Sequence, residues 1–186
     1  AVRLPESVRT DLVHAAAPLH DALPNVRWVR AEALHLTLVF LGEQPADQVE
    51  PIARAMDTAA RERQPFVLIV GGNGCFPSAE RARVLWTGLA GDIDALIALQ
   101  RAVLAALVDA HLVEADYRFS PHLTIGRLRD GTPPPARAAA GRRWTALPAP
   151  APTPIPVEEI HLIRSELLPH GPRHTTLHRS ILTRGR

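Results

Sequence analysis

Two segments of this chain carry the same short pattern, in which a histidine and a threonine flank a leucine and an aliphatic residue follows. They are His35-Leu36-Thr37-Leu38 and His122-Leu123-Thr124-Ile125, one in each half of the sequence. Successive side chains on a strand point to opposite faces, so each histidine would share a face with its threonine while the aliphatic residues share the other. The repeat therefore predicts two strands, each with one core face and one polar face, and indicates two similar lobes.

The rest of the pattern alternates irregularly between strands and helices, which favours an α+β fold over a regular βαβ repeat. Helices are expected after Pro5, after Pro45 and over residues 93–111. Strands are expected over residues 28–29, 34–41, 66–70, 84–86, 117–128, 160–164 and 177–183, with a hairpin connection at 169–172. The segment 129–156 is rich in proline, alanine and arginine, which predicts a loop with at most a short helix near 136–140.

The composition is that of an ordinary globular domain. The chain has 186 residues, of which 46% are hydrophobic and 22% charged, so neither a disordered nor a membrane class is indicated. Without a signal-peptide pattern, and with Cys75 as the one cysteine, we expect a cytoplasmic protein. The net charge is only +2, so any contact with a polyanion must be local.

The repeated residues suit acid and base chemistry on a phosphate ester. A histidine and a threonine two positions apart lie about 6.5–7 Å apart along a strand, so both can address one phosphate. Opening a cyclic phosphate needs a base that activates water and an acid that protonates the departing oxygen, and two imidazoles supply both near neutral pH. Threonine hydroxyls can donate hydrogen bonds to the nonbridging oxygens. No metal and no cofactor are required.

A third match to the tripeptide occurs at His174-Thr175-Thr176. It follows Gly171-Pro172 at a predicted turn exit and lacks the apolar middle residue, so we interpret it as incidental. His170, His174 and His178 also recur with the spacing of metal ligands on a helix, but the intervening Gly171-Pro172 forbids that helix. We expect no metal site there.

Other polar and aromatic residues have structural interpretations. The glycines of residues 71–74 lack the lysine and serine or threonine of a phosphate-binding loop, so they predict a turn. The three tryptophans are expected in the core or in lobe packing, although an exposed one could stack on a base. Four further histidines are interpreted as surface or cap residues: His14, His20, His111 and His161.

At the repeated motifs the sequence resembles the bacterial and archaeal RNA 2′,3′-cyclic phosphodiesterases, historically called 2′-5′ RNA ligases, of the two-histidine phosphoesterase superfamily. The resemblance covers nearly the whole chain, and its segments are residues 34–38, 40–42, 74–77, 84–86, 119–127 and 163–167. It implies a bilobal fold with two antiparallel sheets flanking a central cleft and helices on the outside. It also implies hydrolysis of RNA 2′,3′-cyclic ends to 2′-phosphomonoesters and, in some members, reversible ATP-independent 2′-5′ joining.

The resemblance assigns roles to the motif residues. His35 would be the acid that protonates the 3′ oxygen, and His122 would be the base that activates water. Thr37 and Thr124 would hold the phosphate. The resemblance thus implies a single bilobal domain over residues 1–186 in which each lobe contributes one His-x-Thr strand.

Two further positions bear on substrate binding. Arg127 matches an arginine that lies beside the terminal nucleotide and phosphate in such proteins. Strict alternation puts it on the face opposite His122, so it reaches the site only if the strand ends, bulges or twists near Gly126. Family members usually have a base-stacking aromatic residue in the first strand. This chain starts at Ala1-Val2-Arg3-Leu4, so either that segment is missing or stacking falls elsewhere.

The expected partner is RNA with a 2′,3′-cyclic phosphate end, or a cyclic nucleotide, bound by a monomer that does not enter a membrane. A tRNA fragment, a short oligonucleotide and a small cyclic nucleotide would all present the same phosphate. One alternative is a noncatalytic RNA-end or nucleotide-binding protein on the same fold. Another is a metallohydrolase with scattered histidine ligands, which would lose activity on chelation.

Overall fold

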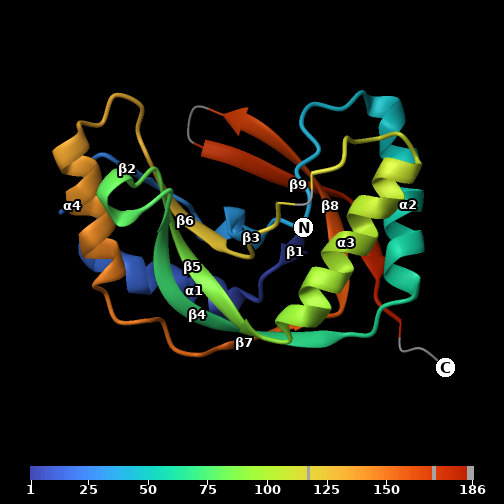
Figure 1. Ribbon diagram of the computed structural model, residues 1–186, viewed down its shortest axis with the longest axis horizontal. Helices are drawn as coiled ribbons and strands as arrows, with labels where there is room; N and C mark the ends of the chain where they lie inside the picture. The colour runs from blue at the N-terminus through green and yellow to red at the C-terminus, as the bar shows by residue number, and fades with distance from the viewer. Residues whose placement is uncertain (117, 169–170, 184–186) are drawn as a thin grey trace.

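The computed structural model describes residues 1–116, 118–168 and 171–183 (Figure 1). Within them the strands are β1 (Val2–Arg3), β2 (Val26–Trp28), β3 (His35–Leu36), β4 (Phe66–Phe76), β5 (Val84–Gly91), β6 (Leu123–Leu128), β7 (Pro154–Val157), β8 (Glu159–Leu168) and β9 (Gly171–Ile181). The α-helices are α1 (Glu6–Ala16), α2 (Val49–Arg61), α3 (Ile93–Asp109) and α4 (Pro134–Thr145).

The strands form a larger and a smaller sheet. The larger sheet has the order β1-β3-β6-β5-β4-β7, with β2 pairing on β6, and the smaller sheet is the β8–β9 hairpin. All of these pairings are antiparallel. This confirms the predicted α+β class and its two antiparallel sheets. Both motif segments belong to the larger sheet, where Leu36 on β3 pairs with Leu123 on β6.

The helices lie toward the two ends of the molecule, with α1 and α4 at one end and α2 and α3 at the other (Figure 1). Helix α1 begins directly after Pro5, whose fixed φ and missing N–H suit a helix start. Its buried residues Val8, Leu12 and Ala16 follow the helical period. The predictions of helices after Pro5, after Pro45 and over most of 93–111 are confirmed. None of the helices described is both long and apolar enough to span a bilayer.

The motif strands are shorter than the sequence predicts. Residues 34–41 were expected to be extended throughout, but β3 covers only His35 and Leu36. Residues 117–128 were expected to form one strand; residue 117 lies outside the described residues, and over 118–128 the strand β6 begins only at Leu123. The reason lies in the partners: β1 offers two residues to β3, and β6 offers it only one. The local β pattern extends further than the available neighbours.

The glycines of residues 71–74 were expected to form a turn, and this prediction was wrong. They continue β4, whose ladder with β5 shifts register between Val70 and Asn73. A Cβ atom at Gly71 would lie 3.1 Å from the backbone carbon of Gly88 on β5, so the two backbones approach too closely for a side chain. The glycines therefore permit an irregular strand.

The segment 129–156 is more ordered than expected, because it contains α4 and β7. The helix starts with prolines in its first turn, where proline is tolerated, and it buries Trp144, which is 1% exposed. Strand β7 alternates exposed prolines with buried Ile155 and Val157, and it lies at the edge of the sheet. Proline lacks the N–H of the ladder, so an edge is where such a strand can pair.

The predicted hairpin near the end of the chain is confirmed by the pairing of β8 with β9. Both strands are longer than expected, and residues 169 and 170 of the expected connection lie outside the described residues. The N–H of His161 on β8 donates to the carbonyl of Ala1, which joins the hairpin to the end of β1. The hairpin thereby lies beside the edge of the larger sheet that carries β1 and β3.

Candidate active site

His35 lies on the polar face of β3, as the alternation predicts. Its neighbour Leu36 is only 1% exposed on the other face, while His35 itself is half-buried. Nδ1 of His35 lies 2.8 Å from the carbonyl oxygen of Ala33. A carbonyl can only accept, so Nδ1 carries the proton in this bond and Nε2 is left for other partners. Nε2 lies 3.1 Å from Oγ1 of Thr37, which is exposed.

His122 has the same local arrangement, although it precedes β6 by one residue. Its Nδ1 lies 2.7 Å from the carbonyl oxygen of Ser120, two residues upstream, just as Nδ1 of His35 meets the carbonyl two residues before it. The next residue, Leu123, is fully buried on the core face. Both imidazoles are therefore held through Nδ1 and present Nε2 on the polar face of one sheet.

A bulge in β6 places Arg127 on the same face as Thr124. Trp86 on β5 pairs with Thr124, but Val84, two residues earlier, pairs with Arg127, so Ile125 is part of a register shift. Trp86 and Val84 are two positions apart and share a face, and directly paired residues point to the same side. The strand bulge that Arg127 needs in order to reach the face of the motif residues is thus present.

A second arginine lies beside the first. Arg27 on β2 is the register partner of Arg127, and both side chains are exposed. Like charges directly opposite each other on a sheet repel, which costs stability. No ion pair with a carboxylate involves either arginine among the residues that the structure describes. The pair therefore presents two positive charges on the face that carries the motif residues.

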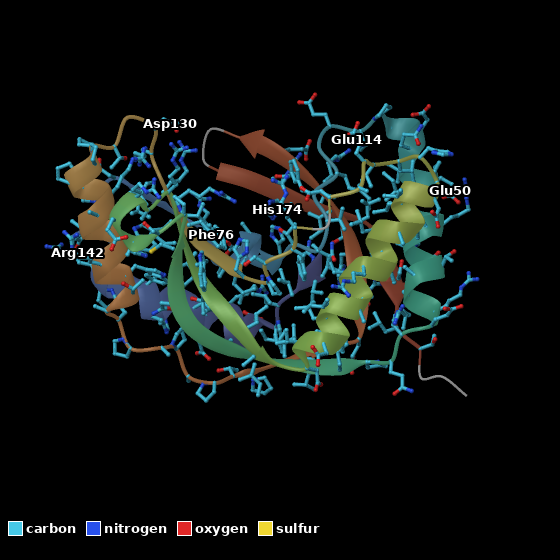
Figure 2. All side chains as sticks on the ribbon, in the orientation of Figure 1. Glu50, Phe76, Glu114, Asp130, Arg142 and His174 are labelled. Carbon is cyan, nitrogen blue, oxygen red and sulfur yellow. The ribbon has the colours of Figure 1, made fainter. Side chains whose placement is uncertain are left out.

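Two aromatic residues pack beside His122. Its ring lies edge-on to Phe76, with 4.9 Å between centroids, and 6.4 Å from the ring of Trp86. Figure 2 shows Phe76 near the middle of the molecule. A Cβ atom at Gly74 would lie 2.2 Å from the Trp86 indole, so the missing side chain makes room for this ring. Both segments belong to the resemblance found in the sequence, where Trp86 was expected to be a packing residue.

The third His-x-Thr unit, interpreted from the sequence as incidental and at a turn exit, also lies beside this site. His174 is on β9 rather than at a turn exit, and its ring lies edge-on to His35 with 5.0 Å between centroids. The label of His174 in Figure 2 marks its place near the centre of the view. Oγ1 of Thr176 accepts a hydrogen bond from Nε of Arg3 at 3.1 Å. Strand pairing, rather than an apolar middle residue, aligns this unit.

Burial and positive neighbours lower the pKa of His35. Desolvation is the largest effect on its pKa, which it lowers, while the hydrogen bond to Ala33 raises it. The charges of His174 and Arg3 lower it further. Burial, and then Arg3, also lower the pKa of His174. The net result is a pKa of His35 below its ordinary value, so His35 holds its second proton less tightly than a free imidazole.

The other histidines that the structure describes do not join this site. Nε2 of His178 lies 2.9 Å from Oδ1 of Asp57 on α2. His161 was expected at the surface, but it is only 6% exposed and its Nε2 lies 3.0 Å from Glu159, so that prediction was wrong. The surface prediction is confirmed for the three others: His14, His20 and His111. No group of three metal-ligating side chains occurs in the described part of the chain. His170 lies outside that part.

An α+β fold that presents two histidines and their threonines on one sheet face defines a class of two-histidine phosphoesterases. The model of the LigT-like phosphoesterase family matches residues 2–86 and 89–174, and the chain belongs to that family.

Relatives and solved structures are consistent with this family. An RNA 2′,3′-cyclic phosphodiesterase of Thermus thermophilus is 33% identical over 95% of this chain and 85% of its own length. One from Escherichia coli is 30% identical over 98% and 94%. A crystal structure from Thermus thermophilus superimposes with a TM-score of 0.80 at 30% identity, covering 98% and 95% of the two chains. Escherichia coli LigT complexed with 3′-AMP gives 0.78 at 26% identity, covering 99% and 96%.

Proposed function

We propose that this protein hydrolyses RNA 2′,3′-cyclic phosphodiester ends to 2′-phosphomonoesters with two histidines as acid and base. The observation that carries the proposal is the matched anchoring of His35 and His122. Each ring donates Nδ1–H to a carbonyl two residues upstream and leaves Nε2 on a shared face. Membership of the LigT-like family and the names of its relatives support the reaction.

In the proposed reaction a water molecule attacks the phosphorus and gives its proton to Nε2 of His122. The bond from phosphorus to the ribose 3′ oxygen breaks, and that oxygen takes the proton from Nε2 of His35. The product keeps the phosphate on the 2′ oxygen. Thr37 and Thr124 donate hydrogen bonds to the nonbridging oxygens, where negative charge builds up in the transition state. We assign the positive charge beside the phosphate to Arg127.

The lowered pKa of His35 makes its charged form a stronger proton donor, which is the role assigned to it. An acid catalyst must hold a proton on Nε2 and release it in the transition state. The monoanionic cyclic phosphate bound nearby favours the protonated imidazole, which opposes the effect of burial and of the neighbouring cations. We therefore expect His35 to be charged in the complex with substrate more often than in the free protein.

Several expectations accompany this proposal and stay predictions. The 1–186 chain would act as a single bilobal domain and as a monomer in the cytoplasm. Reversible 2′-5′ ligation and turnover of small cyclic nucleotides would use the same groups, because each presents the same phosphate to the two histidines.

Product analysis on defined RNA tests the function. We expect an oligonucleotide with a 2′,3′-cyclic end to be converted to the 2′-phosphate in the presence of EDTA, while 2′-phosphate and 3′-phosphate ends stay unchanged. Tight binding without any product would favour the noncatalytic alternative. Loss of turnover on chelation, restored by added metal, would instead support a metallohydrolase.

A further inference from the structure

The side of His35 that faces the hairpin is occupied by the third His-x-Thr unit. His174 lies edge-on to His35 at an interplanar angle of 80° with 5.0 Å between centroids. Two residues along β9, Thr176 accepts the hydrogen bond from Arg3, which is the register partner of His35 on β1. His174 is therefore held beside His35 by pairing within the hairpin and by a bond from the neighbouring strand.

A bulge in β9 separates this histidine from the next one. The ladder with β8 shifts register so that Leu177 has no partner. Thr176 and His174 stay on one face, whereas His178 turns to the other, where it meets Asp57. Without the shift, alternation would put His178 on the same face as His174. The hairpin thus gives one histidine to the site and another to the packing of α2.

Among the residues that the structure describes, the titratable side chains that face His35 are cationic when protonated. Arg3 faces it from β1, and His174 faces it from β9. The carbonyl of Ala33 is the group that favours the charged imidazole. Two imidazoles at this separation do not take up protons independently, because charging one disfavours charging the other.

We propose that His174 is a positioning residue for His35: its ring edge fixes the plane of the His35 imidazole, and its charge limits the pH range in which His35 is protonated. The proposal rests on the role of His35 as proton donor. His174 itself forms no bond in the reaction. It holds Nε2 of His35 toward the ribose 3′ oxygen and makes the charged His35 a stronger acid.

Two substitutions separate the ring contact from the charge. His174→Phe keeps an aromatic edge without a titrating group, and His174→Gln removes both. NMR titration of the His35 imidazole should show an upward shift of its pKa in both variants, because a neighbouring cation is lost. With cyclic-phosphate RNA as substrate, the alkaline limb of the pH profile of kcat/KM should move to higher pH in both variants. Only His174→Gln should lower kcat, by up to ~10²-fold, because misorientation of a catalytic group costs about that much.

The matched control is His178→Phe, the same change four residues along the same strand but on its other face. It should leave the titration of His35 unchanged. If His35 titrates identically in the wild-type protein and in both His174 variants, the charge role is wrong. If the two variants have the wild-type kcat, the orienting role is wrong. The NMR titration does not depend on turnover, so a protein without phosphodiesterase activity would overturn the proposed function and leave this measurement interpretable.

Discussion

Leu36 and Leu123 are register partners across β3 and β6, and each is almost fully buried. This pairing joins the two motif strands directly. Since a side chain adjacent to a buried one on a strand points to the opposite face, the antiparallel pairing also places His35 and His122 on the same polar face, diagonally across the two strands. The core contact and the candidate active site are therefore two faces of the same strand pair.

The assignment of acid and base predicts that His35→Ala and His122→Ala each lower kcat/KM on a cyclic-phosphate RNA by ~10²–10⁴-fold, the usual contribution of a general acid or base. Steady-state kinetics with separated products measure the loss. His14→Ala, a change at an exposed histidine of α1, should keep the wild-type rate. Wild-type activity in both of the first two variants would refute the assignment.

Gly74→Ala should displace the Trp86 indole, because the added methyl group would lie 2.2 Å from ring atoms. We expect a loss of about 1–3 kcal/mol in the free energy of unfolding, as for other overpacked sites. Urea unfolding measures it, and tryptophan fluorescence reports the ring. Gly72→Ala is the control, because a Cβ atom there has no neighbour within 4 Å. Equal effects from both substitutions would argue against a specific role of Gly74.

The paired arginines predict a difference between long and short substrates. Arg127→Gln should raise KM for a cyclic mononucleotide and an oligonucleotide alike, because it is assigned to the reacting phosphate. Arg27→Gln should raise KM for the oligonucleotide alone, because its charge lies one strand further away. The salt dependence of oligonucleotide binding should weaken with each lost phosphate contact. Arg101→Gln, an exposed change on α3, should affect neither substrate. Equal KM changes for both substrates in Arg27→Gln would exclude a contact with the upstream chain.

We expect the contact of Asp57 on α2 with His178 on the hairpin to be sensitive to acid. The hydrogen bond with His178 lowers the pKa of this carboxyl below its ordinary value. A depressed folded-state pKa gives a contribution to stability that is present above the unfolded pKa and is lost as the pH falls through the folded pKa. Asp57→Asn should therefore be less stable than the wild type at pH ~7, and the gap should close under acid conditions.

Urea unfolding at neutral and acid pH measures the gap between Asp57→Asn and wild type. Glu50→Gln serves as control, because it removes an exposed pair with Arg54 whose contribution is expected to be about 0.5 kcal/mol or less. A difference between Asp57→Asn and wild type that is constant with pH would contradict the proposed linkage.

Local patterns predicted those elements that are regular over several residues. Helices after Pro5 and over residues 93–111 follow from apolar spacing, and the half-buried motif strands follow from alternation. The errors fall where tertiary partners decide. The glycines of residues 71–74 stay in a strand because β5 pairs with this part of β4, and β3 stops after two residues because it runs out of neighbours.

By itself, then, the sequence determined which side chains of each motif face the core and which face solvent, because the period of a strand is a local property of the backbone. It could not determine that His174 meets His35, or that Thr124 and Arg127 share a face. The first depends on how the β8–β9 hairpin lies against β1, and the second on a one-residue shift between β5 and β6. Pairing between distant strands sets both, and no local pattern encodes a register.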